Sequence, residues 1–322
     1  MNATTTAMVA VGLYYVGAAL FKAAGARMEP LRGDRPLRML GQLARSHVWL
    51  IGMLVFLVGL ELQLVAFAEL PLGTAMPLFA SSLVLLLWLA VTFFGERLAA
   101  REWLALGLFA LATLTIAASV RPGEGDIGTL PPAPLLLAVM VPSIALPLLL
   151  FSAGDRRPEG RHARPLSGVA YGLSFGVLLG AAEVAVKGLA ILNTGREFGL
   201  GLLAEPYPYL LAIALALGLG QGMIAMQRCR MAICVSVCTI VAKTYLVLAG
   251  SLLYGGDWPA DPLWGVLRLG GAALAIGALF LFPRYDPEGP GAGPSGGYGA
   301  AGRSRSSMTS RAVSISGRPP PR

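Results

Sequence analysis

Residues 167–192 read SGVAYGLSFGVLLGAAEVAVKGLAIL, an apolar run that carries two charged residues, Glu183 and Lys187. About 20 apolar residues, rising 1.5 Å each, cross the hydrocarbon layer of a membrane as a helix. An ionisable residue in such a span is costly, so it usually faces the protein interior or a water-filled path. Residues four apart share a helix face, and Glu183 and Lys187 can therefore neutralise each other.

The composition indicates an integral membrane protein. Of the 322 residues, 56% are hydrophobic and only 13% are charged, whereas roughly 25% are charged in an ordinary soluble domain. The formal net charge is +8. Because the basic residues lie in predicted loops and a tail rather than on one folded face, membrane topology explains them better than a nucleic-acid partner does.

Nine segments are long and apolar enough to span a membrane as helices. They cover residues 6–25, 47–68, 72–94, 102–120, 133–152, 167–192, 207–226, 231–254 and 263–283. The connections on one side and the tail hold twenty Lys/Arg, and those on the other side hold two. By the positive-inside rule, we expect an all-α plasma-membrane protein with its N-terminus outside and its C-terminus in the cytoplasm.

The C-terminal segment 285–322 differs from the rest of the chain. It is built mainly of Gly, Pro, Ser and Arg, a composition that cannot bury a core and predicts a disordered cytoplasmic tail. Its arginines could contact anionic lipid headgroups, although an inert solvated tail is an equal alternative. Residues 1–284 are expected to form the transmembrane domain.

The two halves of that domain carry a weak internal repeat. Lys22 and Lys187 occupy matching places near the ends of the first and sixth spans, and Gln63 and Gln221 match in the second and seventh. The halves are therefore residues 6–120 and 167–283, with 133–152 as a connector helix. An offset of five crossings is odd, so the second half inserts upside down, which gives an inverted 4+1+4 repeat.

Several stretches resemble a known superfamily. GLELQLVAFAELPLGTAMPL (59–78), FFGERL (93–98) and VKGLAI (186–191) resemble motifs of the drug/metabolite transporter superfamily, with its EamA-like fold and small multidrug resistance units. The first and last are similar to the NIPA-type magnesium transporter branch. The resemblance covers residues 6–283 and implies secondary transport by the inverted repeats.

The chain departs from both relatives at acidic positions. Tyr14 and Leu179 stand where small multidrug pumps place a glutamate, so the proton-and-drug exchange of those pumps is not carried over. In the magnesium branch a glutamate precedes the amide of the second span by three residues. Leu60 stands there in this chain, with Glu61 beside it and turned about 100° round the helix.

Two transport hypotheses follow, with a third from another class. Mg²⁺ prefers oxygen ligands and keeps several waters, so Glu183 and Glu61 are candidate metal ligands, although Lys187 and Lys243 would repel a divalent cation. An organic or zwitterionic metabolite is the alternative: both lysines would hold its carboxylate and Glu183 its amine, with Tyr14, Tyr15, Trp88 and Tyr245 around its apolar body. The third hypothesis is a non-transporting scaffold in which polar residues join helices.

The residues expected to line a transport path are Glu183, Lys187, Gln63, Gln221, Lys243 and Glu61. There is no catalytic triad, metal-ligand cluster or phosphate-binding loop, so we expect neither enzyme activity nor a cofactor. Four glycines are expected to permit close helix packing: Gly59, Gly176, Gly180 and Gly188. Association of two chains into a homodimer is left open.

Overall fold

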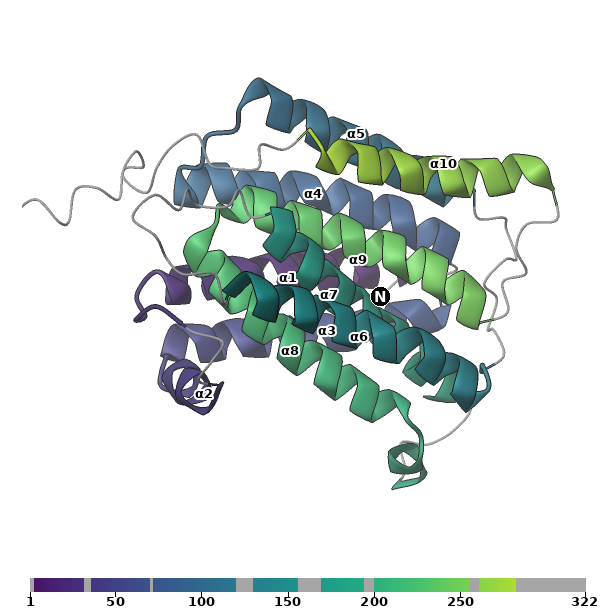
Figure 1. The fold of residues 1–322 in the computed structure, drawn as a ribbon, viewed down its shortest axis with the longest axis horizontal. Helices are drawn as coiled ribbons and strands as arrows, with labels where there is room; N and C mark the ends of the chain where they lie inside the picture. Colours follow the sequence, from purple (N-terminus) through teal and green to yellow (C-terminus); the bar gives the residue numbers. More distant parts are fainter. Residues whose placement is uncertain are drawn as a thin grey trace, which may run out of the picture. The chain divides into compact units, whose positions relative to one another are not determined.

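The computed structural model describes residues 3–31, 36–69, 72–119, 130–155, 169–193, 200–254 and 261–281, and every regular element in these ranges is a helix (Figure 1). In chain order they are α1 (Ala3–Gly25), α2 (Pro36–Ala44), α3 (His47–Glu69), α4 (Leu72–Phe94), α5 (Ala100–Ala118), α6 (Ala133–Asp155), α7 (Val169–Asn193), the 3₁₀ helix η1 (Leu200–Ala204), α8 (Tyr207–Arg228), α9 (Met231–Leu253) and α10 (Pro262–Leu279). The predicted tail 285–322 lies outside the described residues.

Seven of the described helices are long and apolar enough to cross a membrane: α1, α3, α5, α7, α8, α9 and α10. Shorter apolar stretches lie in α4, at Leu83–Phe94, and in α6, at Ala133–Leu149. The chain is therefore an all-α polytopic membrane protein, as its composition predicts. The full count of nine spans stays a prediction.

The helix ends agree with the apolar runs of the sequence. Each of the nine predicted spans falls on one helix, and the boundaries differ by four residues or fewer. Two short elements were not predicted. The first, α2, begins at a proline, which suits the first position of a helix, and it packs against α3 with Leu43 buried. The second is η1.

Helix α7 is the most enclosed of the candidate spans. In the most apolar 18-residue stretch of α7, 83% is buried, against 28% in that of α3. The helix packs against α3, α6, α8 and α9. Figure 1 shows α7 among these helices, while α5 and α10 lie side by side at one edge. Because α7 is enclosed by protein, it can carry Glu183 and Lys187 away from lipid.

A stripe of glycines explains how closely α7 approaches α9. Gly172, Gly176 and Gly180 follow one another at intervals of four, and each faces an α9 backbone carbonyl. A Cβ at Gly176 would lie 2.8 Å from the carbonyl oxygen of Cys238, closer than real contacts allow. This is the small-residue packing typical of membrane helices. The packing role predicted for Gly176 and Gly180 is confirmed.

The other two predicted glycines also lie at close helix contacts. A Cβ at Gly59 on α3 would lie 3.0 Å from the carbonyl oxygen of Ala10 on α1. One at Gly188 would meet the ring of Tyr207 and the hydroxyl oxygen of Tyr254. Close packing is therefore confirmed at all four predicted positions.

Candidate functional site

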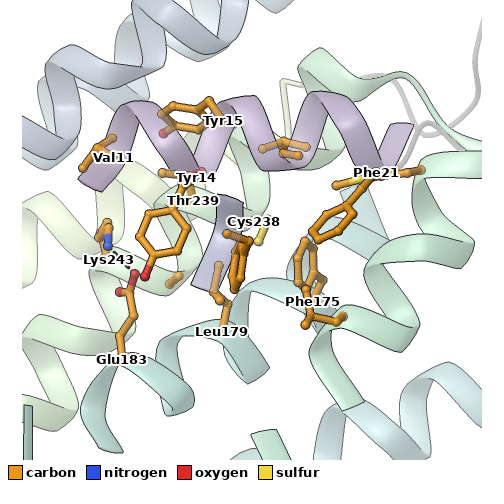
Figure 2. A pocket seen from close by; sticks show the side chains of 16 residues that line it. Val11, Tyr14, Tyr15, Phe21, Phe175, Leu179, Glu183, Cys238, Thr239 and Lys243 are labelled. Carbon is orange, nitrogen blue, oxygen red and sulfur yellow. Dashed lines mark hydrogen bonds and ion pairs between the residues drawn. The ribbon is translucent and has the colours of Figure 1, made fainter. Parts of the chain in front are cut away.

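A cavity lies between helices of both predicted repeats. It is lined by α1 and α3 from the first repeat and by α7, α8 and α9 from the second (Figure 2). The space inside it that is open to the centres of water molecules is about 60 Å³. Since one ordered water needs roughly 10–15 Å³ of such space, the cavity in this state admits a few water molecules or a small solute.

Most of the cavity wall is apolar or aromatic. Tyr14 and Tyr15 line it, as the metabolite hypothesis expected, whereas the rings of Phe21, Phe56 and Phe175 were not anticipated. Tyr14 and Phe56 meet edge to face with ring centroids 4.8 Å apart, which fixes that part of the wall.

Two other aromatic residues of that hypothesis are not among the described residues that line the cavity. Trp88 on α4 is 54% exposed. The hydroxyl of Tyr245 lies 2.7 Å from the Ser143 hydroxyl oxygen on α6 and donates to it. Trp88 is therefore largely at the surface, and the Tyr245 hydroxyl contacts α6.

A buried ion pair stands in the cavity wall. The carboxylate of Glu183 on α7 binds the ammonium group of Lys243 on α9, and the Tyr14 ring lies beside them (Figure 2). Gln63 Nε2 on α3 lies 3.5 Å from Glu183 Oε1, at the long limit of a hydrogen bond. Glu183 Oε2 is buried and has no hydrogen-bond partner among the described residues. One acceptor atom of the pair is thus left unused.

The structure brings three of the six predicted path residues together, namely Glu183, Gln63 and Lys243. Lys187 is buried on α7, one turn beyond Glu183, but it is not among the described residues that line the cavity. Glu183 forms its ion pair with Lys243, sixty residues away, whereas the sequence suggested a partner on the same helix.

Gln221 takes part in a separate polar contact. Its Oε1 atom lies 2.6 Å from the Ser174 hydroxyl of α7, and that hydroxyl is also 3.1 Å from the carbonyl oxygen of Pro147 on α6. Ser174 can therefore donate to one of the two oxygens. These contacts join α6, α7 and α8 and lie outside the described lining of the cavity.

The structure places Glu61 apart from the ion pair. Glu61 is exposed on α3, whereas Gln63, two residues on, is fully buried. Two residues correspond to about 200° around a helix, so the two side chains lie on opposite faces. Gln63 occupies the face toward α7, which excludes Glu61 from the ion pair.

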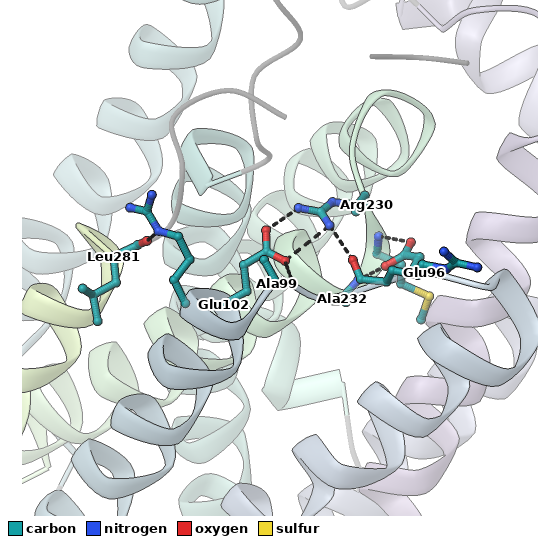
Figure 3. A network of polar contacts seen from close by, with 9 residues as sticks. Glu96, Ala99, Glu102, Arg230, Ala232 and Leu281 are labelled. Atoms are coloured by element: carbon teal, nitrogen blue, oxygen red, sulfur yellow. Dashed lines mark hydrogen bonds and ion pairs between the residues drawn. The ribbon is translucent and has the colours of Figure 1, made fainter. Parts of the chain in front are cut away.

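A second polar network surrounds the link between α8 and α9, residues 229–230. Lys22 at the end of α1 donates to the carbonyl oxygens of Met226 and Cys229, each at 2.6 Å. Two guanidinium nitrogens of Arg230 bind the Glu102 carboxylate on α5, and one of them also donates to the carbonyl oxygen of Arg97 (Figure 3). We call this network the latch, because residues of the first predicted repeat hold a link of the second.

Glu96 completes the latch from the turn after α4. Gly95 has a φ of 62°, a left-handed conformation that suits glycine and ends α4. The carboxylate oxygens of Glu96 then accept hydrogen bonds from the backbone N–H groups of Met231 and Ala232, at 2.6 and 2.7 Å. These are the first two N–H groups of α9, so Glu96 caps that helix from a distant part of the chain.

Because Glu96 is largely buried, stability should depend on pH. Burial raises the pKa of Glu96 above its ordinary 4.5, and the N–H groups of Ala232 and Met231, with Lys22 and Arg230, offset part of the rise. A carboxyl with a higher pKa in the folded chain holds more protons there, so stability falls as pH rises from about 4.5 through the raised folded pKa.

We therefore expect the thermal midpoint of the wild type, in detergent, to fall across this pH interval relative to that of Glu96→Gln, which cannot titrate. Tryptophan fluorescence at a pH series that begins below 4.5 would measure both midpoints. Parallel pH curves for the two proteins would contradict the expectation.

The chain was compared with protein-family models, curated proteins and solved structures. None of them matches.

The chemistry of the described site is that of one ion pair in an apolar chamber. Among the described residues, no three His, Cys, Asp or Glu side chains gather closely enough to hold a metal ion. Glu183 is the single carboxylate among the described lining residues, and Lys243 neutralises it. The arrangement is thus suited to a small solute that has both polar and apolar parts.

Proposed function

We propose that the chain is a secondary transporter of the plasma membrane, of drug/metabolite transporter type, that moves a small organic solute by alternating access. The observation that carries the proposal is the buried Glu183–Lys243 pair in the wall of an apolar cavity between the two predicted repeats. Binding at the interface of inverted repeats, with rocking of one repeat against the other, is typical of such transporters. The proposal includes nine spans, an outer N-terminus and no enzyme activity.

The packing of the helices supports an inverted repeat. If α1, α3, α4 and α5 correspond to α7, α8, α9 and α10, the contacts α1–α3 and α1–α4 become α7–α8 and α7–α9, and all four are present. The contact α3–α7 likewise becomes α8–α1, which is also present, while α4–α9 and α5–α10 each map onto themselves. Such exchangeable contacts are what two related halves would make.

The scaffold hypothesis accounts for the ion pair but not for the cavity beside it. The desolvation cost of a buried ion pair is offset only by good geometry and further hydrogen bonds. A protein with apolar residues of similar size in its place is often equally stable. Glu183 Oε2 lacks such a further bond among the described residues. A pair that is incompletely satisfied and faces a cavity is better explained by ligand binding.

Mg²⁺ transport is the second candidate. It is favoured by the resemblance of residues 59–78 and 186–191 to the magnesium branch, and by two buried acceptors, Glu183 Oε2 and Gln63 Oε1, that lack partners among the described residues. Against it, the Lys243 ammonium is bound to the same carboxylate and would repel the ion. The apolar walls also offer few of the oxygen ligands that Mg²⁺ requires. An organic solute therefore has the stronger support.

The position of the latch indicates what must separate for the cavity to open to the predicted cytoplasmic side. Met226 lines the cavity, and its carbonyl oxygen accepts the hydrogen bond from Lys22. The latch therefore adjoins one end of the cavity, at a link that the charge distribution predicts to be cytoplasmic. Opening of the cavity to that side would require the α8–α9 link to separate from Lys22, Glu96 and Glu102.

Cysteine labelling tests this pathway without knowledge of the solute. The chain has three cysteines, and Cys238 is a free thiol that lines the cavity. With Cys229→Ala and Cys234→Ala, a charged, membrane-impermeant thiol reagent reports access to the cavity from either face of a proteoliposome. We expect labelling from both faces, and Arg230→Met, which weakens the latch, should speed labelling from the predicted cytoplasmic face by about tenfold, the effect of 1.4 kcal/mol.

The matched control is Arg38→Met, which removes an exposed ion pair with Glu29 on the same predicted face. It should leave both labelling rates unchanged. Labelling from one face only, with no response to Arg230→Met, would argue against alternating access through this cavity.

A further inference from the structure

The ion pair in the cavity wall restricts the charge of any ligand that binds there. The side chains of Glu183 and Lys243 are only 5% and 10% exposed, so little water reaches either charge. Lys243 binds Glu183 Oε1, so a ligand group that takes this oxygen displaces the Lys243 ammonium from it. Separation of one member of a buried ion pair from the other costs more than the new contact returns unless both charges find new partners.

Ligands of a single charge fail this requirement. A monocation or Mg²⁺ at Glu183 would place a second positive charge beside the Lys243 ammonium, whether it binds Oε2 or displaces Lys243 from Oε1. An anion at Lys243 would likewise place a second negative charge beside Glu183. A zwitterion can replace both partners at once, because its ammonium group binds Glu183 while its carboxylate binds Lys243.

We propose that the cavity binds an α-amino acid with a small apolar side chain, with its ammonium group on Glu183 and its carboxylate on Lys243. This inference rests on the proposed function of the cavity and names its substrate class. In an α-amino acid both charged groups are attached to one carbon, so a short separation of the ion pair accommodates them. The side chain then meets the wall formed by Tyr14, Phe175 and Leu179.

The unused acceptor at the site matches the hydrogen-bond needs of this ligand. An ammonium group has three N–H donors, and Glu183 Oε2 is a buried acceptor without a partner among the described residues. The ligand therefore supplies a donor that Lys243 alone does not. The limited space of the cavity selects side chains of modest size.

The experiment measures ligand binding to the purified full-length protein in detergent, by thermal stabilisation over a concentration series. The probes are the apolar amino acids, the matching amino-acid amides as cations, N-acetyl amino acids as anions, and Mg²⁺ alone. We expect at least one apolar amino acid to bind about 30-fold or more tightly than either of its singly charged analogues.

Two variants separate ligand recognition from folding. Lys243→Arg keeps the positive charge and should keep the preference for the zwitterion. The double variant Glu183→Gln/Lys243→Met removes both charges together, which leaves neither unpaired, and it should bind the zwitterion no better than the neutral N-acetyl amide. A variant that merely lost stability would not change the order of the ligands.

Two results would overturn the inference: equal binding of amides or N-acetyl analogues, or no stabilisation by any apolar amino acid, whether or not Mg²⁺ stabilises the protein. Each of them differs from a failure of the proposed function. The labelling of Cys238 reports alternating access whichever solute is carried. Access from both faces together with either of these results would therefore support the transporter proposal and reject an apolar amino acid as its substrate.

Discussion

Replacement of Lys243 by methionine is expected to destabilise the protein by about 3–5 kcal/mol, the usual cost of leaving one member of a buried ion pair without its partner. Methionine fills most of the volume of lysine, so the loss would come from the stranded Glu183 carboxylate rather than from a cavity. The measurement is the free energy of unfolding of the purified protein in mixed micelles, followed as a denaturing detergent is added.

The double variant Glu183→Gln/Lys243→Met shows whether the loss arises from the pair. Because it strands no charge, it should recover most of the stability that Lys243→Met loses. Arg38→Met, which breaks an exposed pair with side chains 63% and 71% exposed, should cause almost no change. If the double variant is less stable than Lys243→Met alone, the two side chains do not stabilise each other.

The helices could be predicted because apolar helices are encoded locally. An apolar run bounded by Lys or Arg defines a helix, and α9 begins at Met231, directly after Arg228 and Arg230. Glycine spacing could be read in the same way, since Gly176 and Gly180 lie on one face of α7 and meet α9. These features depend only on residues that are close in sequence.

The partner of Glu183 could not be predicted with that reasoning. Helical periodicity places Lys187 beside Glu183, but it contains no information about which residue of another helix approaches, and Lys243 is that residue. The same limit applies to α3. Spacing alone says that Glu61 and Gln63 lie on opposite faces, and only the packing against α7 shows that Gln63 is the inner one.

The latch shows how two charges of the first predicted repeat hold a link in the second. The C-terminal carbonyl groups of a helix carry partial negative charge and the N-terminal N–H groups partial positive charge. Lys22 binds the carbonyl end of α8, and Glu96 binds the amide end of α9. The sequence identified FFGERL (93–98) as a motif. The partner of its glutamate lies 135 residues away, so the capping role of Glu96 could be seen only in the folded structure.

Replacement of Gly176 by alanine is expected to disturb the centre of the helix bundle. The added Cβ would lie 2.7 Å from Val241 Cβ and 2.8 Å from the carbonyl oxygen of Cys238. A helix carbonyl cannot turn aside as a flexible side chain can, so α7 and α9 must separate. We expect a loss of about 1–3 kcal/mol from overpacking, measured in the same unfolding titration.

The matched control is Gly270→Ala on α10, where an added Cβ meets nothing within 4 Å. That variant should be as stable as the wild type or slightly more stable, because alanine is favoured over glycine inside a helix by about 1 kcal/mol. Since α7 carries Glu183 and α9 carries Lys243, Gly176→Ala should also weaken the ion pair and binding in the cavity, whereas Gly270→Ala should not. If the two variants behave alike, close α7–α9 packing does not position the site.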